Sequence, residues 1–215
     1  MVHNLSNTNS IFSSFLAEIR DVDIQKDSMR FRRNLERISE VLGYELSKKL
    51  HYAEKEITTP LGVANVPLLS EQPVLATILR AGLGMHIGLL NYFDRAESAF
   101  ISAYRKHTTA EDFEIYTEYI AAPKIDNKIL IISDPMLATG SSMVTVYKTL
   151  RQQGVPSKTF VVSAIATPDA IDHCKSHLPD NTEYFLGAID DELTAQSYIV
   201  PGLGDAGDLA YGEKY

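Results

Sequence analysis

A run of apolar residues that ends in a carboxylate is the most informative feature of this chain. Residues 129–132 lead to Asp134, and a loop of small residues follows before a helical pattern begins. Backbone N–H groups of such a loop and the positive end of a helix dipole favour a phosphate group, and the carboxylate can accept hydrogen bonds from ribose hydroxyls. The segment therefore predicts a sugar-phosphate site, with an ordinary capped strand-to-helix turn as the alternative. The loop residues assigned to this site are Pro135, Met136, Leu137, Ala138, Thr139, Gly140, Ser141 and Ser142.

A cation stands at the end of another apolar run. Arg80 follows residues 74–79 and precedes Gly82 and Gly84. The spacing does not fit a dinucleotide fingerprint, because the third glycine is one position late, and no Gly-Lys-Ser/Thr ending marks a Walker loop. Arg80 at the carboxyl end of a strand is the kind of group that faces an anionic ligand. A surface arginine beside a glycine turn is the alternative.

A long insertion and a glycine-rich C-terminal segment add two further candidates. Arg105 stands at the start of residues 105–127, which we interpret as a flap hairpin that could close over a polyanion; a plain surface hairpin is the alternative. Residues 198–208, YIVPGLGDAGD, crowd three glycines around Asp205 and Asp208. Their backbone groups could bind the edge of a planar heterocycle, and the apolar residues among them argue against a frayed terminus.

The elements that must position these groups alternate between strand and helix from residue 73 onward. Continuous apolar strands separated by helices predict an α/β fold with a central, mostly parallel sheet of about five strands flanked by helices. Ligands of such sheets bind beyond the carboxyl ends of the strands. The predicted strands are 74–79, 99–104, 129–132, 159–166 and 183–189, and the predicted helices are 84–93, 142–153 and 168–177.

Residues 1–70 are expected to form an N-terminal helical arm. Apolar side chains spaced by three and four residues predict a long helix that begins near Ser28, and residues 58–63 predict a turn between two extended pieces. We expect one domain over 1–215, made of this arm, the flap 105–127 and a base-binding segment 196–215.

The composition excludes several classes of protein. The net charge of −8 and the lack of a Lys/Arg cluster argue against a nucleic-acid surface. No apolar run is long enough to span a membrane, and no export signal is visible, so a cytoplasmic location is expected. The single cysteine, Cys174, excludes an intramolecular disulfide, and the histidines offer no metal-binding spacing.

Four motifs together resemble the uracil phosphoribosyltransferase family. They are ILRAGLG at 78–84, the Tyr-Arg pair at 104–105, DPMLATGSS at 134–142 and YIVPGLGDAGD at 198–208, and the resemblance extends from the helix near residue 30 to the C-terminus. The resemblance implies the phosphoribosyltransferase fold and the transfer of ribose 5-phosphate from 5-phosphoribosyl 1-diphosphate (PRPP) to uracil, giving UMP and diphosphate. Several positions depart from the family pattern. Ser141 replaces a second glycine, Leu209 replaces a common arginine, and Ser133 stands where related phosphoribosyltransferases often carry a second acid. Residues 106–122 of the flap match the pattern poorly.

The resemblance also implies the roles of individual residues. The PRPP loop would be 134–142, the diphosphate would face Arg80 and Arg105, and Asp205 would be the PRPP-side carboxylate. Asp134, Arg105 and Asp205 are the predicted catalytic residues, and uracil would meet Ile199, Gly204, Asp205 and Ala206. Mg²⁺ would be held through PRPP, with no protein ligand assigned directly. A homodimer or higher homo-oligomer and a possible GTP effector are further expectations.

Two alternatives remain open from the sequence. One is a regulatory protein that senses PRPP or UMP with a transferase fold and little activity; its expected basic RNA face does not fit the net charge. The other is a related transferase that uses a purine base, which the C-terminal motif disfavours.

Overall fold

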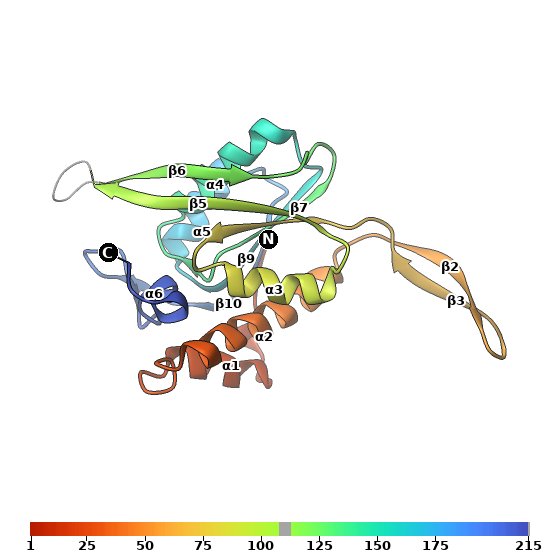
Figure 1. Cartoon of the computed structure of the whole chain (residues 1–215), viewed down its shortest axis with the longest axis horizontal. Coiled ribbons are helices and arrows are strands. Elements are labelled where there is room, and N and C mark those ends of the chain that lie inside the picture. The colour runs from red at the N-terminus through yellow and green to blue at the C-terminus, as the bar shows by residue number, and fades with distance from the viewer. Residues whose placement is uncertain (108–112, 215) are drawn as a thin grey trace.

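The computed structural model describes residues 1–107 and 113–214, with the side chains of residues 103–118 outside that description. An eight-stranded sheet forms its centre (Figure 1). Its order is β1-β10-β9-β7-β4-β5-β6, with β8 paired to β9, and every pair is parallel except β5 with β6. The strands of the sheet are β1 (Val2–Asn4), β4 (Val74–Leu79), β5 (Glu97–His107), β6 (Phe113–Ala121), β7 (Ile129–Ser133), β8 (Met136–Leu137), β9 (Lys158–Ala166) and β10 (Glu183–Ile189).

The predicted fold class is confirmed. The five predicted strands are β4, β5, β7, β9 and β10, which lie side by side in the sheet. The sheet is wider than predicted because β1, β6 and β8 join it. The sequence pattern did not predict these three strands, because β1 and β8 are only three and two residues long and β6 lies within the segment interpreted as a flap.

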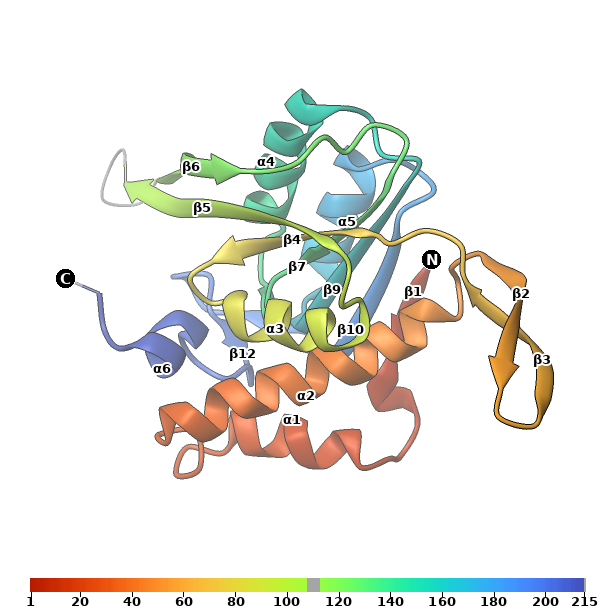
Figure 2. The same cartoon turned by 45° about the vertical axis from the view of Figure 1, so that its right-hand side comes forward.

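Helices cover both faces of the sheet (Figure 2). One face packs against α1, α2 and α3, and the other packs against α4 and α5. Alternate residues of one strand serve the two cores: Leu75 belongs to the first, whereas Val74 and Ala76 belong to the second. The helices are α1 (Phe12–Arg20), α2 (Ser28–Ser47), α3 (Leu83–Tyr92), α4 (Ser141–Leu150), α5 (Pro168–His177) and α6 (Ala206–Tyr211), with short 3-10 turns η1 (Leu5–Asn7) and η2 (Arg151–Gln153).

The long N-terminal helix begins where the sequence predicts. Asp27 caps α2 by accepting a hydrogen bond from the Arg30 N–H at 3.0 Å, and Ser28 is the first helical residue. Its apolar stripe is buried in the first core, so the spacing of three and four marks the side that faces the sheet. The buried members of this stripe in α2 are Phe31, Leu35, Ile38, Leu42 and Leu46, whereas Leu50, the last residue of the predicted stripe, is buried but lies beyond the end of the helix at Ser47.

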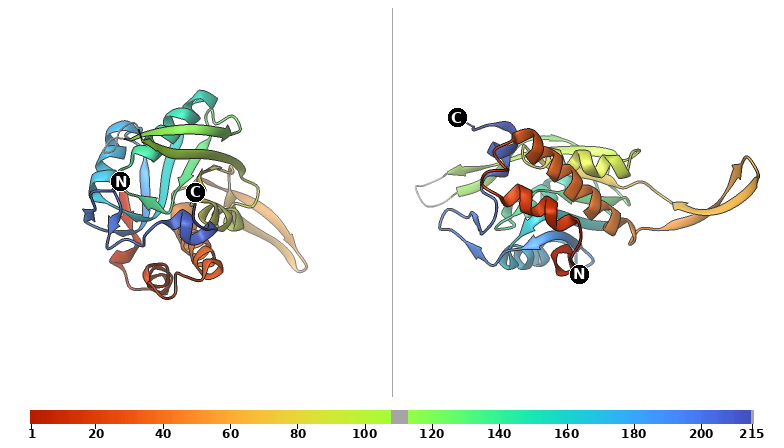
Figure 3. Two further views of the ribbon diagram at one scale, coloured as in Figure 1. Left: turned by 60° about the vertical axis from the view of Figure 1, so that its left-hand side comes forward. Right: turned by 90° about the horizontal axis from the view of Figure 1, so that it is seen from below.

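Two short hairpins lie apart from the main sheet. The first, β2 (Tyr52–Thr59) with β3 (Gly62–Leu69), projects from the body at the end where β4 begins (Figure 1; Figure 3, right). All residues of β2 are exposed. The second, β11 (Glu192–Leu193) with β12 (Ile199–Val200), leads into α6. Among the described residues, no helix is both long and apolar enough to cross a bilayer.

The topology fixes where a ligand can bind. The chain runs from β4 to β5 in one direction across the sheet, and from β7 through β9 to β10 in the other. The neighbours β4 and β7 therefore flank a switch point, where the loops beyond two parallel strands diverge and leave a crevice. Those loops carry Arg80 and Asp134.

Candidate active site

The loop after β4 packs against the end of β7 at the switch point. Thr77 on β4 is in register with Ser133 on β7, so the strands end side by side. A Cβ atom at Gly82 would lie 2.2 Å from Thr77 Oγ1 and 3.1 Å from the Ser133 carbonyl oxygen. Only glycine allows the loop after β4 to pass this close to the end of β7.

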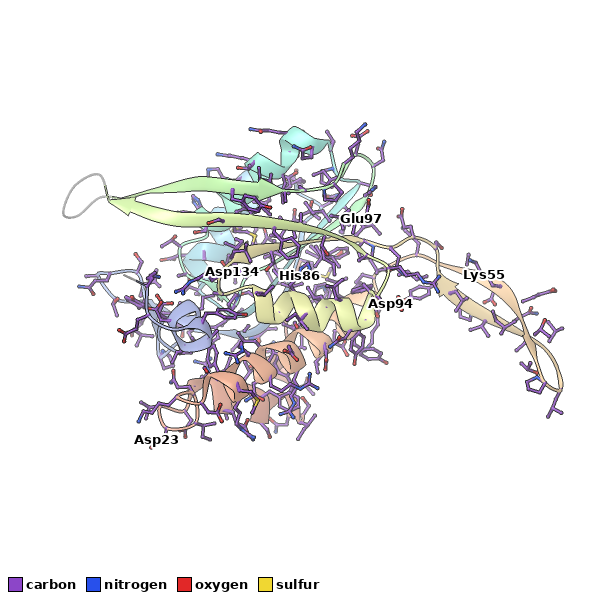
Figure 4. All side chains as sticks on the ribbon, viewed as in Figure 1. Asp23, Lys55, His86, Asp94, Glu97 and Asp134 are labelled. Atoms are coloured by element: carbon purple, nitrogen blue, oxygen red, sulfur yellow. The ribbon has the colours of Figure 1, made fainter. Side chains whose placement is uncertain are left out.

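Asp134 lies at the carboxyl end of β7, on the side of the sheet that faces the C-terminal segment (Figure 4). Its N–H donates to the Val162 carbonyl at 3.1 Å, which continues the ladder with β9, and its Oδ1 accepts from the Met136 N–H at 3.3 Å. Burial raises the pKa of Asp134 to about 7, and the hydrogen bond from Met136 offsets only part of that effect. Because the side chain remains partly accessible, it can still meet a ligand hydroxyl.

Ser133 does not share this position. Its side chain is buried, and its Oγ donates to the Ala76 carbonyl at 3.3 Å. Among the described side chains here, Asp134 is therefore the single acid at the end of β7.

The loop after β7 needs a glycine at one position. Gly140 has a φ of +76°, and a Cβ there would lie 2.8 Å from the Ala170 carbonyl oxygen and 3.0 Å from Cys174 Sγ. Ser141 begins α4 and has no left-handed φ, so the backbone accepts a side chain where the family pattern has a second glycine. Its N–H donates to Thr139 Oγ1 at 3.4 Å, and the two hydroxyls lie 3.1 Å apart.

The N-terminus of α4 can bind an anion. Gly140 occupies the cap position and offers no side-chain acceptor for the first-turn N–H groups. Ser141 and Ser142 are partly exposed there. These N–H groups, the helix dipole and the two hydroxyls could interact with an anion, and phosphate binding at this loop stays a prediction.

Arg80 connects the switch point to the C-terminal segment. Its Nη2 donates to Asp208 Oδ1 at 2.8 Å, and its Nη1 donates to the Gly212 carbonyl at 3.1 Å. The arginine side chain is 42% exposed. The guanidinium is thus accessible to a ligand, but a diphosphate would have to replace the carboxylate of Asp208.

The C-terminal segment presents backbone rather than side chains. Ile199 and Ala206 are buried in the first core, so their main-chain groups are what remains for a ligand. Gly204 has a φ of +93° and is exposed, and a Cβ there would have Leu209 Cδ1 as its nearest neighbour, 3.9 Å away. Main-chain recognition of a planar base at this segment stays a prediction.

Asp205 has a structural role that the sequence did not indicate. It caps α6, since Oδ1 accepts from the N–H groups of Gly207 at 2.9 Å and Asp208 at 3.0 Å, and its Oδ2 accepts from Lys214 Nζ at 3.1 Å. Burial acts to raise the pKa of Asp205, but the helix N–H groups and Lys214 outweigh it, so this pKa lies below its usual value. The carboxylate stays ionised beside the switch point.

The position of Arg105 relative to the site stays a prediction. Its backbone lies in β5, in register with Ile115 of β6, so the two strands extend the edge of the main sheet. The side chain lies outside the described part of the chain, as does the tip of the predicted flap at 108–112.

Sequence reasoning missed three residues that hold the C-terminal segment. Arg20 and Asp190 bind Gly202, and Arg32 Nη1 donates to the Ala210 carbonyl at 2.6 Å. Asp190 directly follows β10, so the rule that found Asp134, a carboxylate at the end of a buried strand, could have found it. No sequence signal connects the two arginines to residues about 180 positions away.

The parallel sheet, the two loops at its switch point and the exposed N-terminus of α4 are the features expected of a phosphoribosyltransferase. The likeness to a hypoxanthine phosphoribosyltransferase from Staphylococcus aureus is one of fold alone, with a TM-score of 0.50 and 15% identity over 86% of this chain and 84% of the other. A family model described as uracil phosphoribosyltransferase matches residues 6–213. The uracil phosphoribosyltransferase of Porphyromonas gingivalis is 54% identical over 213 residues, 99% of both chains. A solved structure from Aquifex aeolicus has a TM-score of 0.87 and 30% identity, covering 99% of this chain and 98% of that one. The chain belongs to the uracil phosphoribosyltransferase family.

Proposed function

We propose that this protein transfers the ribose 5-phosphate group of PRPP to uracil, forming UMP and diphosphate. The bond between ribose C1 and the diphosphate oxygen breaks, and the diphosphate keeps the electron pair. A ring nitrogen of uracil forms the new bond to C1 and gives up its proton to the diphosphate or to water. The observation that carries this proposal is that the Arg80 loop packs against the end of β7, directly before Asp134, and pairs with Asp208 of the C-terminal segment.

The residues at this edge have chemistry suited to each part of PRPP. The N-terminus of α4 would bind the 5-phosphate, and Asp134 would hold the ribose hydroxyls. Arg80 and Arg105 would stabilise the negative charge that builds up on the departing diphosphate. Fixed positions for ribose and base lower the entropic part of the barrier.

Uracil would be bound by the main chain at Ile199, Gly204 and Ala206, with the carboxylate of Asp205 beside it. Backbone N–H and C=O groups can match the alternating donors and acceptors of a pyrimidine edge. The buried side chains at 199 and 206 hold these groups in place.

Mg²⁺ is proposed to arrive with PRPP. Among the side chains that the structure describes, in residues 1–102 and 119–214, no cluster of three or more His, Cys, Asp or Glu could hold a metal. Mg²⁺ commonly binds substrate phosphates and waters with only one or two carboxylates, and the ionised Asp205 fits that requirement. The metal would neutralise diphosphate charge; dependence of turnover on added Mg²⁺ tests its role.

A parallel assay of bases tests the reaction. We expect PRPP-dependent nucleotide formation with uracil, and little with cytosine, hypoxanthine or guanine. Turnover of a purine base would support the alternative transferase, and no turnover with any base would support the regulatory alternative.

A matched pair of arginine variants tests the diphosphate role. Arg80→Ala should lower kcat/KM for PRPP by roughly 10²-fold, the scale of one lost transition-state contact. Arg95→Ala is the control, because Arg95 is exposed next to the start of β5, at the other end of the strands. Equal kinetics for the two variants would remove Arg80 from the mechanism.

The projecting β2–β3 hairpin supports the proposal of a homodimer. It pairs only with itself in the described part of the chain, yet it exposes large apolar side chains, including Leu61 at 100% and Val63 at 66%. A second copy that covers this hairpin would bury them. Light scattering should give a dimer mass for the unaltered chain and a lower mass for a Leu61→Glu/Val63→Glu variant; a monomer in both would refute the proposal.

The GTP effector and the cytoplasmic location stay predictions from the sequence. Initial rates with and without GTP test the first, and cell fractionation tests the second.

A further inference from the structure

Three groups far apart in the sequence form a closed ring of hydrogen bonds under the C-terminal segment. Arg20 ends α1, Asp190 follows β10, and Gly202 lies between β12 and α6. The guanidinium donates to both carboxylate oxygens, from Nη1 to Oδ2 at 2.7 Å and from Nη2 to Oδ1 at 2.9 Å. Arg20 Nη1 also donates to the Gly202 carbonyl at 3.0 Å, and the Gly202 N–H donates to Asp190 Oδ2 at 2.9 Å.

The ring fixes both main-chain groups of one residue. Gly202 has a φ of +55°, and a Cβ there would lie 2.0 Å from the Ile199 carbonyl oxygen, so the chain turns tightly at this point. Asp190 is 8% exposed and the arginine side chain 24%, so the pair is largely shielded from water. A planar guanidinium fork holds a carboxylate in one orientation, which gives the ring directional rigidity.

This rigidity acts where the proposed uracil contacts lie. Gly202 stands between Ile199 and Gly204, whose backbone is proposed to bind the base. Among the described residues, this stretch pairs as a strand only through the short pairing of Glu192–Leu193 with Ile199–Val200. A shielded ion pair contributes little net stability compared with apolar packing, so precise placement is the property that these two side chains add.

We propose that Arg20 and Asp190 are positioning residues of the uracil site. They touch neither substrate; they set the place of the base-binding backbone through Gly202. This inference rests on the proposed function and adds residues that fix where the base sits.

Steady-state kinetics with both substrates varied test the proposal. Asp190→Asn and Arg20→Gln should raise KM for uracil about tenfold or more, because a small misplacement of a binding group is costly, and leave KM for PRPP within about threefold. Arg20→Lys keeps the charge but loses the fork, so its uracil KM should lie between those of the unaltered enzyme and Arg20→Gln. If these residues only stabilised the fold, the variants would not raise the KM for uracil more than the KM for PRPP. Nor would Arg20→Lys have a smaller effect on the uracil KM than Arg20→Gln.

The control is another bidentate pair of the same region. Arg30 donates to both carboxylate oxygens of Glu18. This ion pair joins the start of α2 to α1 and does not include Gly202. Arg30→Gln should leave both KM values unchanged.

The outcomes separate the inference from the proposed function. If the unaltered enzyme does not use uracil, both are overturned. If it does, but the ring variants keep its uracil KM or lose affinity for uracil and PRPP equally, only the inference is overturned. Thermal unfolding of each variant identifies any that fails to fold. If Asp190→Asn and Arg20→Gln do not fold, the milder Arg20→Lys is the test variant. A uracil KM of Arg20→Lys equal to that of the unaltered enzyme would then overturn the proposal.

Discussion

Replacement of Asp134 by Asn should stabilise the protein while removing its activity. The carboxyl of Asp134 has a pKa of about 7 in the folded chain, compared with an ordinary value of 3.8, because burial disfavours its charge. Asn has nearly the same shape and can keep the hydrogen bond from Met136, but it carries no charge. Asp134→Asn should thus raise the free energy of unfolding, because no charge is buried, while it lowers kcat/KM, because the carboxylate is lost.

The sign of the pH dependence follows from linkage. Between pH about 4 and 7 the native state binds a proton that the unfolded state has lost, so the stability of the unaltered protein falls as pH rises through this window and then levels off. For a shift from 3.8 to about 7, the cost is ~1.7 kcal/mol at pH 5 and ~4.3 kcal/mol at pH 8. These are upper limits, because the partly exposed carboxylate keeps some contact with water. The free energy of unfolding of Asp134→Asn, relative to that of the unaltered protein, should therefore rise by about 1 to 2.5 kcal/mol between pH 5 and pH 8.

Urea unfolding of both proteins at pH 5 and pH 8, without PRPP, measures this difference. If Asp134 acts in the transition state as proposed, the kcat/KM of the variant should fall by about 10²-fold or more. Asp94→Asn serves as control, because Asp94 is exposed, and its effect should stay within about 0.5 kcal/mol at both pH values. A stability difference that does not change with pH, or that favours the unaltered protein more at pH 8, would refute the reasoning.

Three further predictions concern the loop after β7 and the helix beneath it. Gly140→Ala should destabilise the protein by about 1 to 3 kcal/mol in urea unfolding, because the left-handed φ and the contact with the Ala170 carbonyl both oppose a side chain; an unchanged midpoint would contradict this. Thr167 Oγ1 accepts from the Ala170 N–H at 3.1 Å and donates to the Ala138 carbonyl at 2.7 Å, so Thr167→Ala should cost about 1 to 3 kcal/mol, with Thr167→Ser as the milder control. Burial raises the pKa of Cys174 to about 12, so the native protein should not react with a thiol reagent at pH 8, whereas the urea-unfolded chain should; rapid labelling of the native protein would count against the buried position.

The regular elements could be predicted because their signals are local. The stripe from Phe31 to Leu46 and the capping Asp27 fix α2, and the apolar run 183–189 is recovered as β10 with the same ends. Short elements carry too few residues for a period to show, so β1 and β8 were missed, although β1 closes one edge of the sheet.

The candidate site divides in the same way. The Asp134 loop was visible because strand, acid, glycine and helix follow one another within fourteen residues. The capping role of Asp205 was not visible, since it depends on α6, a helix of six residues, and on Lys214 folding back. The pairing of Arg80 with Asp208 likewise joins positions that are 128 residues apart.

The sequence alone therefore determined the kind of protein: the order of the longer strands and helices, the loop predicted to bind phosphate and the motifs of the uracil phosphoribosyltransferase family. The tertiary structure decided which of those pieces meet. β4 and β7 become neighbours only when the sheet assembles, and that pairing brings Gly82 against Ser133 and places Arg80 and Asp134 at one edge. The ring of Arg20, Asp190 and Gly202 has the same origin. Periodicity and caps act within a few residues along the chain, whereas burial, strand register and ion pairing act between atoms that folding brings together.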